Sequence, residues 1–104
     1  MASYMLMTGD PIDVETAFRL GLVVEICDPS QTVARAIEIA GTIAQRAPMA
    51  VQYTKECIRV AVGATHENGI SYERDALWRN SMTDDRREGM SAFVEKRQPK
   101  FSGR

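Results

Sequence analysis

The sequence is poor in the residues that metal and redox sites require. Among its 104 residues there are two cysteines and one histidine. Cys27 and Cys57 are isolated, and neither belongs to a CxxC motif or has a histidine beside it. This spacing excludes the common zinc and dithiol patterns. We therefore expect no metal site and no redox site, and the unpaired thiols are typical of a reducing cytoplasm.

A catalytic constellation is also missing. His66, the one histidine, stands beside Glu67 near the expected start of a helix. A His–Glu pair could act as a general base, but the sequence supplies neither a nucleophile nor a third group to orient the imidazole. We interpret both side chains as solvated, and we predict no catalytic residue in this chain.

Neither an excess of one charge nor a long apolar run is present. Thirteen basic and fourteen acidic residues give a net charge of −1, so we expect neither nucleic acid nor an anionic membrane as a partner. No apolar run approaches the roughly 20 residues that a membrane-spanning helix needs. We also expect no signal peptide, and therefore a cytoplasmic protein.

Residues typical of β-strands are scarce, and they occur consecutively only in residues 22–26. Elsewhere apolar residues recur at helical spacing, interrupted by proline and glycine. Asp13, Thr65 and Thr83 can begin helices, because their side chains can accept a hydrogen bond from the first turn. The predicted fold class is mainly α, with four to five helices and one short strand.

The single expected strand argues against an independent protein. A strand cannot pair its own backbone N–H and C=O groups, and the sequence offers no second strand. The expected helix over residues 33–47 also has an apolar stripe that is half alanine, which suits close packing against a large neighbour. We therefore interpret the chain as one domain of something larger.

The most specific pattern lies in residues 84–104. Thr83 can cap a helix whose first turn contains two aspartates, where the helix dipole favours negative charge. Gln98-Pro99 is expected to end this helix. One face carries residues at three- and four-residue steps, and the charges beyond Glu95 are all basic. The residues of the face are Met90, Phe93, Val94 and Arg97; the basic residues are Lys96, Arg97, Lys100 and Arg104.

The run Asp84-Asp-Arg-Arg-Glu-Gly-Met-Ser-Ala-Phe-Val-Glu-Lys-Arg97 resembles the closing helix of the enoyl-CoA hydratase/isomerase family, the crotonases. Thr8-Gly9-Asp10, Ala17 and Gly21-Leu22-Val23 resemble a second segment of that family. The resemblance extends from Tyr4 to Arg104. It implies that residues 1–104 are the C-terminal helical, trimerisation domain of a crotonase-like enzyme, without its N-terminal catalytic domain.

The resemblance also implies a function for the parent enzyme. It would bind an acyl-CoA thioester as substrate, without a cofactor, and hydrate trans-2-enoyl-CoA thioesters. It would form a homo-oligomer, a trimer or a dimer of trimers. This chain alone would be inactive and would cover the coenzyme A end of the site. The alternative is a small helical adaptor or oligomerisation module without enzymatic activity, with Phe93 as an interface anchor.

Three side chains are candidates for substrate contact. In the crotonases the residues that match Phe93 and Lys96 lie beside the adenine and the 3′-phosphate of coenzyme A, which suits an aromatic ring and an ammonium group. Leu77 matches a position that can line the acyl pocket. The alternatives are a core ring for Phe93, a solvated charge for Lys96 and plain core packing for Leu77.

Overall fold

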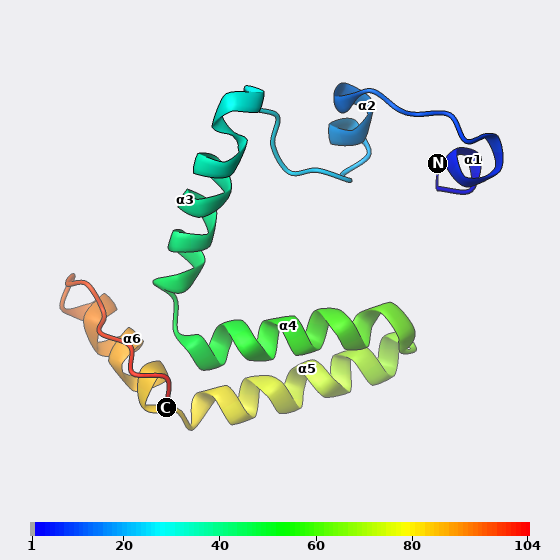
Figure 1. The fold of residues 1–104 in the computed structure, drawn as a ribbon. Coiled ribbons are helices and arrows are strands. Elements are labelled where there is room, and N and C mark those ends of the chain that lie inside the picture. Colours follow the sequence, from blue (N-terminus) through cyan, green and yellow to red (C-terminus); the bar gives the residue numbers. More distant parts are fainter. Residues whose placement is uncertain (1) are drawn as a thin grey trace. The chain divides into compact units, whose positions relative to one another are not determined.

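The computed structural model describes residues 2–104, which contain six α-helices and one short 3-10 helix but no strand. In chain order these are α1 (Ala2–Thr8), α2 (Val14–Arg19), η1 (Pro29–Gln31), α3 (Thr32–Ala44), α4 (Pro48–Gly63), α5 (His66–Ser81) and α6 (Asp84–Val94) (Figure 1). The chain divides into two compact units, residues 1–36 and 37–104.

The predicted strand is absent, so the predicted fold class of four to five helices with one short strand is wrong. Residues 22–26 form an irregular connection between α2 and η1. The Leu22 amide donates to the Ala17 carbonyl and so closes the end of α2. The two carboxylate oxygens of Glu25 accept hydrogen bonds from the Arg35 Nε at 2.8 and 3.0 Å. Residues 22–26 have no second strand beside them in the described part of the chain, so they form no ladder of inter-strand hydrogen bonds.

The predicted helix starts are confirmed. Asp13, Thr65 and Thr83 each accept a hydrogen bond from a backbone amide of the first turn, and so cap α2, α5 and α6. Such a bond satisfies one of the amides that a helix start leaves without an intrahelical partner. Asp28 caps the short η1 in the same way, with Pro29 following it.

In the second unit, α4 and α5 lie side by side and run in opposite directions (Figure 1). The Tyr72 hydroxyl on α5 donates to Glu56 on α4 over 3.1 Å. The Arg79 guanidinium lies 5.1 Å from the centre of the Tyr53 ring and 5.7 Å from that of Tyr72. The hairpin is thus held by a cation between two aromatic rings as well as by apolar contact.

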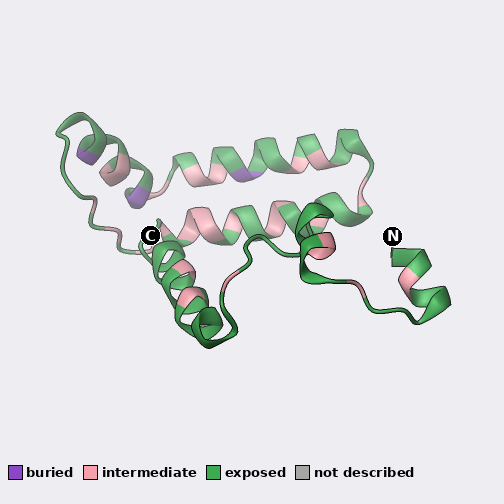
Figure 2. Cartoon of the chain, turned by 90° about the horizontal axis from the view of Figure 1, so that it is seen from above, coloured by how far each residue is buried: buried purple, intermediate pink, exposed green. Residues whose placement is uncertain are grey.

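Few side chains of the described residues are buried: Ala76, Asp85 and Ala92 (Figure 2). Many large apolar side chains are exposed instead, including Val33 at 72% and Val62 at 88%. Soluble monomers rarely leave so much apolar surface bare. Within each unit, the faces of these helices therefore lack a covering layer.

None of the described helices combines the length and the apolar character that crossing a membrane would require.

Candidate functional site

The chain beyond α6 folds back along that helix and is fixed to it at two carboxylates. The first is Asp85, in the first turn, which is only 2% exposed. Its oxygens accept the amides of Ser102 at 2.6 Å and Gly103 at 2.8 Å, and its own amide donates to the Arg104 carbonyl at 3.0 Å. The Ser102 amide, followed by that of Gly103, lowers the pKa of Asp85 despite its burial.

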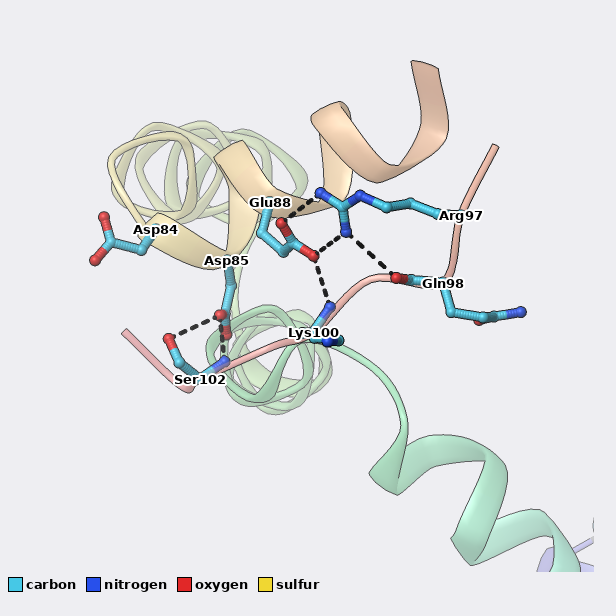
Figure 3. A pocket seen from close by; sticks show the side chains of 7 residues that line it. All are labelled: Asp84, Asp85, Glu88, Arg97, Gln98, Lys100 and Ser102. Atoms are coloured by element: carbon cyan, nitrogen blue, oxygen red, sulfur yellow. Dashed lines mark hydrogen bonds and ion pairs between the residues drawn. The ribbon is translucent and has the colours of Figure 1, made fainter. Parts of the chain in front are cut away.

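The second carboxylate is Glu88, one turn further along α6 (Figure 3). Its two oxygens accept Nη1 and Nη2 of Arg97 at 2.6 and 2.9 Å. One of them also accepts the backbone amide of Lys100 at 2.7 Å. A guanidinium fork facing both oxygens of a carboxylate is the strongest common ion-pair geometry. The Arg97 fork, followed by the Lys100 amide, lowers the pKa of Glu88 to about 2.

These carboxylates line an open hollow of about 540 Å³ together with Asp84, Arg97, Gln98, Lys100 and Ser102. Both Asp85 and Glu88 stay ionised at neutral pH, because their pKa values lie below the usual range. A general acid needs the opposite shift. The two carboxylates therefore hold the tail, and their chemistry is that of hydrogen-bond acceptors.

Phe93 and Lys96 lie at the end of α6, where the tail begins. The Phe93 ring is 82% exposed, and Lys96 is exposed as well. The two residues are adjacent in the closing turn: the Lys96 amide donates to the Phe93 carbonyl at 3.3 Å, and the Arg97 amide to the Ala92 carbonyl at 3.0 Å. This pair of bonds is the Schellman motif that ends many helices. The structure thus brings the two predicted contact residues together on one exposed turn.

Leu77 lies on a different hollow, of about 210 Å³, between α4 and α5. Its side chain is 62% exposed, and Ala50, Tyr53, Cys57 and Asn80 are among its neighbours on the lining. Phe93 and Lys96 do not line this hollow. Leu77 therefore does not share a site with them in the described structure.

The carboxylates that fix the tail were not predicted from the sequence. Arg97 was predicted to lie on the helix face of Met90 and Phe93. The helix instead ends at Val94, and Arg97 returns to Glu88 across the turn. The predicted end at Gln98-Pro99 lies four residues beyond Val94 and therefore gave no sign of this return.

Comparison with known proteins decides the family. The model of the enoyl-CoA hydratase/isomerase family matches residues 1–104. The chain belongs to the enoyl-CoA hydratase/isomerase family. It is 34% identical to the 2,3-dehydroadipyl-CoA hydratase of Escherichia coli K12 over all of this chain and 41% of that protein. It is 35% identical to the crotonyl-CoA hydratase of Syntrophomonas wolfei over 97% of this chain and 39% of that protein.

The fold comparison agrees. The crystal structure of an enoyl-CoA hydratase from Bacillus anthracis matches with a TM-score of 0.92 and 35% identity, over 99% of this chain and 40% of that one. The chain thus spans about two fifths of the length of these family members. The predicted assignment to the C-terminal helical domain is corrected to a coarser statement: residues 1–104 are a helical segment of an enoyl-CoA hydratase/isomerase family protein.

Proposed function

We propose that the full-length protein containing this segment binds acyl-CoA thioesters and hydrates trans-2-enoyl-CoA. Membership of the enoyl-CoA hydratase/isomerase family supports the substrate class, and a relative named crotonyl-CoA hydratase supports hydration. The observation that carries the proposal is the exposed turn at the end of α6. It places an aromatic ring and a lysine three residues apart, with no protein partner in the described structure covering the ring.

The role of this turn follows from the chemistry of coenzyme A. The adenine is a flat heterocycle, and a ring such as that of Phe93 can stack on it. The neighbouring 3′-phosphate is anionic, and the Lys96 ammonium can donate a charge-assisted hydrogen bond to it. Both contacts lie far from the reacting thioester, so they contribute binding to the ground state and to the transition state alike.

The reacting end of the substrate would be served by other parts of the protein. Two backbone N–H groups would hold the thioester oxygen and stabilise an enolate-like species, and carboxylates would add water across the double bond. We assign no residue of this chain to these steps. Leu77 would line the acyl pocket only if the hollow between α4 and α5 continues into that pocket in the complete protein.

A second candidate function is oligomerisation, because the helices leave so many apolar side chains exposed. We propose that the complete protein forms a homo-oligomer, a trimer or a dimer of trimers, and that this segment contributes to its contacts. An adaptor without activity would use the same faces, but it has no need of an exposed lysine beside an exposed ring.

The test is hydration of crotonyl-CoA by the full-length protein, followed by the loss of absorbance of the conjugated thioester. We expect turnover that scales with enzyme concentration, and no turnover from residues 1–104 alone at the same concentration. Hydration by the 104-residue chain would place the chemistry in this segment and overturn the division of roles. A full-length protein that binds acyl-CoA but adds no water would overturn the reaction and keep the substrate class.

A further inference from the structure

The backbone at Lys96 adopts the left-handed conformation, with φ of +53°. It is the only non-glycine residue between positions 2 and 104 with a positive φ. Glycine is the usual residue at this position of a Schellman motif, because a Cβ atom is disfavoured there. A strained residue of this kind persists only where its surroundings hold it.

Besides the two backbone bonds of the Schellman motif, Glu88 and Arg97 hold the chain that follows Lys96. Arg97 follows Lys96 directly, and its guanidinium faces both oxygens of Glu88. The Lys100 amide, four residues after Lys96, donates to the same carboxylate. One side chain of α6 therefore fixes the chain on the far side of the strained residue (Figure 3).

We propose that Glu88 is a positioning residue that, through Arg97 and the Lys100 amide, holds Lys96 in its left-handed conformation and so aims the ammonium at the phosphate of a ligand whose flat ring lies on Phe93. This inference rests on the proposed function, because the ligand is the 3′-phosphate end of an acyl-CoA thioester. Glu88 itself does not touch the ligand. Its three acceptor contacts all go to the tail.

The direct test is Glu88→Gln in the full-length protein, assayed with crotonyl-CoA and with its dephospho analogue, which lacks the 3′-phosphate. Glutamine keeps the shape and one acceptor but loses the charged fork. We expect KM for crotonyl-CoA to rise about three- to fivefold with little change in kcat, and KM for the dephospho substrate to stay within error. In a Lys96→Ala background Glu88→Gln should add no further increase, because the group that it positions is gone.

Arg97→Lys tests the same contact from the other side, in case Glu88→Gln does not fold. It keeps the charge and loses the bidentate fork, and we expect the same dependence on the 3′-phosphate. Arg87→Lys is the matched control, since Arg87 lies on the same helix and pairs with Asp84 instead. It should leave both KM values unchanged.

The outcomes separate the inference from the function on which it rests. If Lys96→Ala raises KM only for the substrate with the 3′-phosphate but neither Glu88→Gln nor Arg97→Lys does, the positioning role is wrong and the phosphate contact stands. If Lys96→Ala affects both substrates equally, the phosphate contact is wrong and the inference falls with it. Equal effects of Glu88→Gln on both substrates, or a further increase in the Lys96→Ala background, would mean that Glu88 only supports the fold.

Discussion

At the scale of the residue, the exposed turn at the end of α6 makes Lys96 the first target. We expect Lys96→Ala in the full-length protein to raise KM for crotonyl-CoA about fivefold, which corresponds to about 1 kcal/mol for a partly exposed charge-assisted contact. The kcat should hardly change, since the contact is equal in ground state and transition state. Steady-state kinetics at low and high salt checks this, because added salt screens an exposed pair and should shrink the difference. An effect on kcat alone would contradict the assignment.

The effect of Phe93→Ala on KM should depend less on salt than the effect of Lys96→Ala. Phe93→Ala removes a ring that is 82% exposed, so we expect KM to rise by a similar factor but nearly independently of ionic strength, because stacking involves no net charge. Met90→Ala is the control, since Met90 is half-exposed on the same helix. Equal effects of the two substitutions on KM would show that the apolar face as a whole, and not the Phe93 ring, contributes to substrate binding.

At the scale of the element, the two carboxylates of α6 make the docking of the tail dependent on pH. The pKa of Glu88 falls from 4.5 to about 2 in the folded chain. A carboxylate with a depressed folded-state pKa contributes stability that is complete above its unfolded value and is lost as the pH falls through its folded value. The difference in melting temperature between wild type and Glu88→Gln should therefore be constant above about pH 5 and shrink from there towards pH 2.

The same measurement on Arg87→Lys provides the control for this pH dependence. The Arg87 partner, Asp84, lies in the first turn of α6 and outside the tail contacts. The difference in melting temperature between Arg87→Lys and wild type should not show the pH dependence expected for Glu88→Gln. A Glu88→Gln difference that stays constant down to pH 2 would mean that the fork with Arg97 does not form in solution.

The sequence predicted the elements of this chain better than the links between them. Capping by Asp13, Thr65 and Thr83 follows from local chemistry, because a side-chain oxygen and an amide three residues on are close in any helix start. The strand predicted at residues 22–26 does not form, since β-branched residues favour a strand only when a partner strand exists. The fork of Glu88 and Arg97 joins residues on the two sides of a turn. Its geometry depends on where α6 ends, and helix ends are the least certain feature that a pattern predicts.

For the candidate site, the sequence supplied residue types and the resemblance supplied their roles. Structure added that Phe93 and Lys96 share one turn, and that Leu77 lies on another hollow. The first statement depends on where α6 ends, and the second depends on how α4 lies against α5, so spacing alone gives neither.

At the scale of the whole molecule, the exposed apolar faces dominate the expected behaviour. Val33, Ile37 and Val62 are at least two-thirds exposed, and large bare apolar patches drive association. We expect the isolated 104-residue chain to sediment as a dimer, trimer or aggregate at micromolar concentration. Sedimentation velocity over a range of concentrations checks this. A monomer that persists at every concentration and unfolds cooperatively would contradict it.

The strained backbone at Lys96 has a consequence for how this position tolerates change. Glycine there would relieve about 1 kcal/mol of backbone strain, so a selection that rewards folding alone should enrich Lys96→Gly. A selection that rewards hydration of enoyl-CoA thioesters should deplete the same variant, because glycine lacks the ammonium that we propose as the phosphate ligand. At this position glycine therefore favours stability and lysine favours substrate affinity. The two selections, applied to one library, should change the frequency of glycine in opposite directions.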